Sequence, residues 1–217
     1  MIIAQLLSAA FGQAFSRNRE IHKSWISISF RVGSSLPNSL LPLSIQKAGE
    51  LDLLLRSLEA EFSSQPSEGA DPFLFNNSKQ AMLTELWIGM VYEIFRLLIE
   101  RDLAPDRTEF KALAHELRLL RIPLEKHEIA ADKKLSGPLL LQRLPVVEGA
   151  NGDFTYNNRH NKKSHIMPFT TSNRGSIMWN VIDTESQNSY WLERLSLSDR
   201  IVALFSVDRV PGVPVAA

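Results

Sequence analysis

The chain has 217 residues and a formal net charge of zero, because 24 Lys and Arg balance 24 Asp and Glu. The zero total excludes a basic field over the whole protein, so a nucleic-acid site has to rest on a local patch. Cysteine is absent, which excludes disulfides, cysteine-ligated zinc, iron–sulfur clusters and thiol catalysis.

The first segment, residues 2–15, is apolar, and its large side chains recur in helical register. This pattern predicts an amphipathic helix that packs on the core. A cleaved signal peptide and a helix on a membrane surface are the alternatives. The segment lacks the positively charged start of a signal peptide, and its near-absence of Lys and Arg argues against a membrane surface. The sequence leaves open whether residues 1–16 are a packed helix or a processed segment.

Residues 25–33, WISISFRVG, alternate apolar and polar side chains and predict a half-buried strand. A connector with two prolines follows. A leucine stripe then predicts a helix over 44–62, whose exposed side carries Glu50, Arg56, Glu59 and Glu61. Residues 63–76 contain two prolines and a glycine and predict a loop.

The strongest helix is expected over 78–102, where a wide apolar stripe favours a central place in a bundle. Asp106 and Glu109 have the spacing of a capping box that opens the next helix. Pro123 is expected to end or kink that helix, because proline removes a donor and clashes with the preceding turn. A second helical piece is expected over 124–134.

The last third of the chain predicts a long polar loop over 145–175, with a short hairpin as an option. A strand, a turn and a return strand follow within 176–195, and a last helix covers 198–206. The fold class is therefore mainly α: one domain, a helical bundle with a small antiparallel β element built from 25–33 and 176–195. The two strand regions are expected to pair.

Signatures of several enzyme classes are missing. The sequence has no GxxxxGK(S/T) or GxGxxG phosphate loop and no GxSxG, and its two His-Glu pairs lack the second histidine of HExxH. His160 and His165 stand in a loop without an evident third ligand. We therefore expect neither a metal nor another cofactor.

Arg121 and His127 are the residues that best suggest chemistry, within the stretch LRLLRIPLEKHEIAADKKL. If Pro123 bends the chain between them, the two side chains lie on nearly one face. Histidine can move a proton near neutral pH, and arginine can bind a phosphate and stabilise developing charge. Such a pair suits RNA cleavage without a metal.

The stretch Arg121-Ile-Pro-Leu-Glu-Lys-His127 resembles the motif of the HEPN family, in which an Arg is followed by four to six residues and a His. The resemblance covers about 60 residues and includes the long helix before the motif. It implies a helical bundle, a homodimer in which two motifs face each other, and a metal-independent endoribonuclease of the toxin or phage-defence type. Some relatives only bind partners, so a non-catalytic protein-interaction domain is the alternative.

The resemblance assigns phosphate binding to Arg121 and proton transfer to His127. Around them we expect Arg118 and Lys126 to bind RNA, and Glu93 and Arg96 to orient the pair. A second basic cluster adds Arg159, Lys162 and Lys163, with aromatic residues just before it. Ordinary ion pairs on a solvated helix face and a solvated loop are the alternatives.

The expected partners are RNA, a second copy of the chain, and a protein partner or antitoxin. No stretch approaches the about 18 uninterrupted apolar residues of a membrane-spanning helix, so we expect a cytoplasmic protein without membrane contact. The alternatives differ in one observable. An enzyme should bring Arg121 and His127 together in one cleft, whereas an interaction domain should pair them with Glu residues of their own helix.

Overall fold

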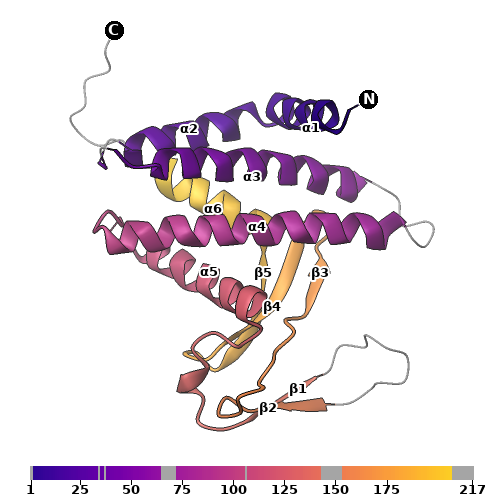
Figure 1. Cartoon of the computed structure of the whole chain (residues 1–217), viewed down its shortest axis with the longest axis vertical. Coiled ribbons are helices and arrows are strands. Elements are labelled where there is room, and N and C mark those ends of the chain that lie inside the picture. The colour runs from indigo at the N-terminus through magenta and orange to yellow at the C-terminus, as the bar shows by residue number, and fades with distance from the viewer. Residues whose placement is uncertain are drawn as a thin grey trace.

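The computed structural model describes residues 2–33, 35–36, 38–64, 72–105, 107–142 and 153–206. The helices are α1 (Ile3–Arg17), α2 (Arg19–Gly33), α3 (Leu41–Ser64), α4 (Pro72–Glu100), α5 (Thr108–Lys126) and α6 (Arg194–Ser206), with a 3-10 turn, η1 (Asp132–Lys134). The strands are β1 (Leu139–Gln142), β2 (Asp153–Tyr156), β3 (Phe169–Thr171), β4 (Ile177–Asp183) and β5 (Asn188–Glu193). The fold is mainly α with a small antiparallel β part (Figure 1), so the predicted fold class is confirmed.

The helix α4 lies at the centre of the helical part, between α3 and α5 (Figure 1). Its wide apolar stripe is buried as predicted, through Trp87, Ile88, Val91, Ile94, Phe95 and Leu98. The Phe95 ring stacks on Phe110 of α5 with 4.7 Å between ring centroids, and its edge contacts Phe205 of α6. One helix thus organises the core through contacts with its neighbours on both sides.

The β part consists of two separate antiparallel sheets. In the larger sheet, of order β3-β4-β5, Trp179 of β4 lies opposite Phe169 of β3 and Leu192 of β5. Alternate residues of β4 are buried under α4, α5 and α6. The hairpin predicted within 176–195 is confirmed, except that α6 already begins at Arg194.

The smaller sheet is the ribbon of β1 and β2, in which Leu139 lies opposite Tyr156. Both β2 and β3 lie inside the region that the sequence predicts as a long loop over 145–175. Of that region, residues 145–152 lie outside the described residues. Residues 157–168 connect the two sheets without regular structure, as expected of a loop.

Residues 25–33 form the second half of α2, so the prediction of a strand there was wrong. Trp25 and Ile28 are both buried, and their separation of three is that of one helix face. The segment therefore fits both the two-residue period of a strand and the 3.6-residue period of a helix, and its packing against α3 selects the helix. The indole Nε1 of Trp25 donates a hydrogen bond to Asp52 Oδ2 of α3 at 2.9 Å. Because residues 25–33 are helical, the predicted pairing of this segment with the strands in 176–195 was also wrong.

Pro123 lies inside α5 and does not end it, because the helix continues to Lys126. The Pro123 carbonyl accepts the N–H of His127 at 3.0 Å, so only the bond that its own missing N–H would have made is lost. The helix ends instead at His127, whose φ of 56° is left-handed. The helical piece predicted over 124–134 is accordingly reduced to the end of α5 and to η1.

Several predicted helix ends shift. The helix predicted over 44–62 is α3, and the one predicted over 198–206 is α6, each longer than expected. Helices α3 and α4 extend into the loop predicted over 63–76, and residues 65–71 of it lie outside the described residues. Asp106 of the predicted capping box is also outside them, while Arg107 occupies the N-cap of α5, and its side chain does not cap the helix but donates to the Leu204 carbonyl of α6 at 3.3 Å.

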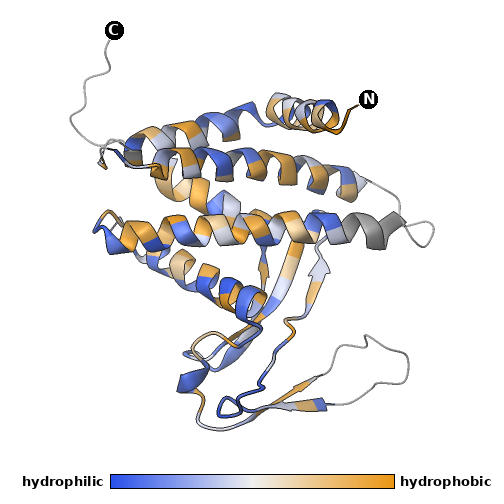
Figure 2. Cartoon of the chain, in the orientation of Figure 1, coloured by the Kyte–Doolittle hydropathy of each residue, from blue (hydrophilic) through white to orange (hydrophobic). Residues whose placement is uncertain are grey.

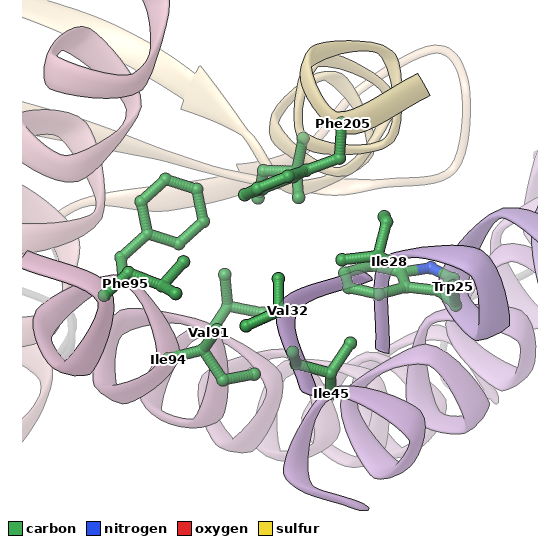
Figure 3. Close-up of a pocket in the computed structure, with 10 residues that line it drawn as sticks. Trp25, Ile28, Val32, Ile45, Val91, Ile94, Phe95 and Phe205 are labelled. Atoms are coloured by element: carbon green, nitrogen blue, oxygen red, sulfur yellow. The ribbon is translucent and has the colours of Figure 1, made fainter. Parts of the chain in front are cut away.

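A small void lies in the core, enclosed by apolar side chains of α2, α3, α4 and α6 (Figure 3). Its lining consists of Trp25, Ile28, Val32, Ile45, Val91, Ile94, Phe95, Leu98, Ile201 and Phe205. The volume of about 10 Å³ is at the lower limit for one water molecule, and the lining side chains offer almost no polar partner. This void is therefore a packing imperfection, which cannot hold a ligand.

A buried ionic cluster fastens α3 to α6. The fully buried guanidinium of Arg194 donates hydrogen bonds to both Asp52 and Glu59 of α3. Glu59 is thus buried, although the helical pattern predicts it on the exposed side. Burial favours the neutral acid, yet Arg194 and Arg56 outweigh this for Asp52 and lower its pKa. Burial prevails for Glu59 and raises its pKa despite Arg194.

Candidate functional site

Arg121 lies on the side of α5 that faces α4, and acidic side chains surround its charge. One amino group pairs with Glu125 of the same helix, and the other lies 4.0 Å from Glu93 Oε1 of α4. The guanidinium also lies over the ring of Tyr92, at 5.6 Å from its centroid. The two carboxylates therefore compensate the cation that the sequence assigns to phosphate binding.

The two predicted supporting residues, Glu93 and Arg96, are linked to Arg121 by consecutive ion pairs. Arg96 donates to Glu93 Oε2 at 2.7 Å and also pairs with Glu100. Glu93 stands between the two arginines, so it orients both of them. Glu93 thus lies next to Arg121, whereas Arg96 is linked to Arg121 through Glu93, and the supporting role of both residues stays a prediction.

Arg121 opens onto a groove of about 430 Å³ between α3, α4 and α5. The lining is Ser44, Lys47, Glu85, Leu86, Gly89, Met90, Glu93, Ile94, Leu97, Arg121 and Glu125. Three carboxylates face two cations there, so the local field opposes a phosphate. Burial raises the pKa of Glu85 above its usual value, and the nearby His127 acts in the opposite direction.

His127 stands at the end of α5 with its side chain exposed. No hydrogen bond or ion pair within the described ranges joins it to Arg121. Arg121 instead pairs with a Glu residue of its own helix, which is the arrangement expected of the interaction-domain alternative. The left-handed conformation of His127 turns the chain away from the axis of α5 and directs it toward η1.

The two basic segments of the sequence meet at His127. Its carbonyl accepts the backbone N–H of His165 at 2.7 Å. Close by, Lys163 Nζ donates to Asp132 Oδ2 at 2.5 Å and lies 3.5 Å from Glu128. Residues 118–135 and 157–165 therefore form one continuous region, which we call the junction surface.

Behind the junction surface lies a small polar core. The Tyr156 hydroxyl donates to Asp132 Oδ2 at 2.8 Å and accepts the N–H of Ile129 at 3.3 Å. Burial raises the pKa of Tyr156 well above its usual value. The ring of His165 lies edge-on to Tyr156, and burial lowers the pKa of His165 to about 4, which keeps it neutral. These groups hold the irregular segment 157–168 against the end of α5.

Sequence reasoning missed this polar core. Asp132 has no motif around it, and Tyr156 was noted only as an aromatic residue near the basic cluster. His165 was considered as a metal ligand, whereas its Nδ1 is buried without a hydrogen-bond partner among the described residues. The one available signal was a run of polar and aromatic residues in a long loop, which does not specify contacts.

The outer face of the junction surface carries exposed cations. Residues 118–135 and 157–165 hold eight Lys and Arg against three Asp and Glu, and Figure 2 shows hydrophilic residues along η1 and the loop after β2. Five of these cations are exposed and have no ion pair among the described residues: Arg118, Lys126, Lys133, Arg159 and Lys162. Of the RNA-binding residues predicted around Arg121 and His127, Lys163 alone is held by carboxylates of the described residues.

Over the described ranges, no three His, Asp or Glu side chains converge in a group that could hold a metal ion. His160 and His165 do not come together as ligands, because His160 Nδ1 accepts the N–H of Lys162 at 3.1 Å while His165 is buried. In the same part of the chain, no helix has the length and apolarity to cross a membrane.

The chain matches no protein-family model, no curated protein and no solved structure. The resemblance to the HEPN family therefore stays a prediction.

Proposed function

We propose that this protein binds RNA through the junction surface. The observation that supports this proposal is the hydrogen bond from His165 N–H to the His127 carbonyl. It joins two basic segments that are far apart in the sequence into one surface with a clear excess of positive charge. The zero net charge of the chain is compatible with this, because the excess is local.

The exposed cations suit a phosphate backbone. Arg118, Lys126, Lys133, Arg159 and Lys162 have no competing carboxylate partner among the described residues, so binding a phosphate does not first require breaking an ion pair. Neutralising phosphates releases condensed counterions, which makes the affinity fall steeply with salt. The buried hydrogen bond from Tyr156 to Asp132 and the partly buried one from Lys163 to Asp132 hold the underlying loop in place.

We assign metal-independent RNA cleavage, the activity that the HEPN resemblance implies, to His127 at the edge of this surface. Its imidazole is exposed and can exchange a proton with a ribose hydroxyl or a leaving oxygen. Arg121 has to release Glu125 before it can contact a phosphate. In this proposal RNA binding comes from the junction surface, and Arg121 acts only after that exchange.

A non-catalytic protein-interaction domain is the second candidate. The pairing of Arg121 with Glu125 favours it, because this pair and Glu93 leave an acid-lined groove with apolar walls between α3, α4 and α5. Such a groove fits a partner segment that offers apolar and basic side chains.

One set of experiments separates these functions. Binding of a fluorescent single-stranded RNA is measured by anisotropy at about 50 and 200 mM salt. We expect Lys126→Glu with Lys162→Glu to weaken binding at least about tenfold at the lower salt. Arg19→Glu with Lys23→Glu is the matched control, because it changes the charge by the same amount at two residues that are also exposed but lie on α2, away from the junction surface. Equal affinities of the wild type and the double variant would contradict the proposal.

Cleavage is then measured in EDTA with wild type, His127→Ala and Arg121→Ala. Loss of cleavage in His127→Ala, with RNA binding retained, is the expected result. RNA binding without any cleavage by the wild type would refute the enzymatic part and leave an RNA-binding protein. Absence of both binding and cleavage would leave the interaction domain.

A further inference from the structure

The helix α1 exposes a continuous set of large apolar side chains. They are Ile2, Ile3, Leu6, Leu7, Phe11 and Phe15, with exposed fractions between 37% and 74%. We call these six residues the α1 stripe. Ala14 is the only buried residue of α1, so the helix is not packed on the core in the way that the sequence predicts.

The stripe is held in place from one end. At the C-terminal end of α1, the side-chain amide of the C-cap residue Asn18 donates to Ser57 Oγ of α3 at 3.1 Å, and Arg17 pairs with Glu61 of α3 at 2.8 Å. The ring of Phe15 lies edge-on to His22 of α2. These contacts fix the direction of the helix while its first turns keep their apolar side chains in water. A partner would therefore meet a preformed surface.

The chemistry of α1 restricts what can cover the stripe. Residues 2–16 contain no Asp, Glu, Lys, Arg or His. Without basic side chains, the helix has no electrostatic attraction to anionic lipid or nucleic acid. An uncharged apolar surface is matched best by another uncharged apolar surface, and the α1 stripe of a second copy is such a surface.

The exposed area is sufficient for such a contact. From their exposed fractions, the six residues leave about 650 Å² uncovered per copy, so full mutual coverage of two stripes buries at most about 1,300 Å², near the lower end of the range of specific interfaces. Two-fold pairing is the commonest symmetry of homo-oligomers and uses the same patch on both subunits. Ala10, the middle residue of α1, is small and exposed, which lets two helices approach closely at its level.

We propose that the protein forms a homodimer in which the α1 stripes of two copies pack against each other. In Figure 1, α1 and η1 lie at opposite ends of the long axis of the molecule. Pairing through α1 therefore leaves the junction surface of each copy free. It also differs from the dimer that the HEPN resemblance implies, because it does not bring two copies of His127 together. The inference does not depend on RNA binding.

The test is the mass of the full-length protein in solution, measured by light scattering or sedimentation from about 1 to 100 μM, since association follows mass action. We expect the wild type to have twice the mass of the chain and Leu7→Glu to have the mass of one chain. Ile99→Glu is the matched control, because Ile99 near the C-terminal end of α4 is equally exposed and belongs neither to the α1 stripe nor to the groove lining, and this variant should remain a dimer. Far-UV circular dichroism checks that all three proteins are folded.

A monomeric wild type over this range would overturn the proposal, and so would a dimer that persists in Leu7→Glu. Cross-linking gives a second measurement, because the chain has no cysteine of its own. Ala10→Cys is expected to form a covalent dimer under mild oxidation, whereas Gly12→Cys, on the opposite side of α1, is not. Cross-linking that is as fast through position 12 as through position 10 would also overturn the proposal. RNA binding is measured separately, so failure of one proposal does not imply failure of the other.

Discussion

Arg194 and Glu59 form a fully buried ion pair that joins the last described helix to α3. The same guanidinium also pairs with Asp52, which has Arg56 as a second cationic partner, so two arginines face two buried carboxylates. Replacing Arg194 with a side chain of similar length, in Arg194→Met, leaves Glu59 buried without a counter-charge among the described residues and leaves Asp52 with Arg56 alone. We expect a loss of about 3–5 kcal/mol in the free energy of unfolding, measured by urea denaturation.

Arg174→Met is the control for this change. Arg174 makes comparable ion pairs with Glu193 and Asp199, but its side chain is 45% exposed. Its loss should lower the free energy of unfolding by no more than about 1 kcal/mol. Equal losses of unfolding free energy in the two variants would show that burial does not make the Arg194 ion pairs more important for stability than exposed ones.

Gly175 is expected to tolerate no side chain. Its φ of 73° is left-handed, and an added Cβ would lie 2.2 Å from the Glu59 carbonyl oxygen of α3. Gly175→Ala should therefore lower the free energy of unfolding by at least about 2 kcal/mol, visible as a lower melting temperature. Gly12→Ala has open space around it and lies in a helix, so it should raise stability by up to about 1 kcal/mol. A change of the same sign in both variants would contradict this explanation.

His165 should make the protein less stable as the pH falls. Burial lowers its pKa to about 4 in the folded state, whereas an unfolded histidine binds a proton near pH 6.5. The unfolded state therefore takes up the proton first. Stability from this residue is lost between about pH 6.5 and 4, by up to about 3 kcal/mol in total.

His165→Phe keeps a ring against Tyr156 and removes this titration. We expect the difference in free energy of unfolding between pH 7 and pH 5 to be smaller in the variant. Asp52 and Glu59 also have shifted pKa values, but both proteins share them, so their effect on stability cancels in the comparison. The neighbouring Tyr156 and Lys163 have raised pKa values and do not titrate between pH 5 and pH 7. An identical pH difference in the two proteins would speak against a buried neutral His165.

Glu125→Gln is expected to release Arg121. The substitution removes the carboxylate that pairs with Arg121 on its own helix but keeps the shape of the side chain. If Arg121 contacts RNA, this variant should bind RNA at least several-fold more tightly at low salt, because the local negative charge falls by one. Glu50→Gln removes an equal charge from α3, away from the junction surface, and serves as the control. No difference between these two variants would place Arg121 outside the RNA-binding surface.

The helices were predictable where apolar residues repeat with the helical period over several turns. The stripe of α4 is the clearest example, and it is buried as expected. Residues 25–33 failed because Ile28 belongs both to an alternating series and to a helical one. The contact between Trp25 and Asp52 decides between them, and a contact with another helix cannot be read from a local pattern.

The candidate site was predictable only in part, for a similar reason. The basic residues were identified in two separate segments, but their meeting depends on the irregular course of residues 157–168. The pairing of Arg121 with Glu125 follows from i,i+4 spacing and was open to prediction. Burial of Glu59 was not, because Arg194, its counter-charge among the described residues, comes from the other end of the chain.

The position of Arg194 in the sequence also affects when the core can form during synthesis of the chain. Asp52 and Glu59 are made early, yet the cation that pairs with both is translated only near the end of the described chain. A nascent chain that stops before residue 194 cannot bury Glu59 without leaving it unpaired, whereas Asp52 already has Arg56 of its own helix. The core is therefore completed late, by a contact of long sequence separation, and such contacts form slowly.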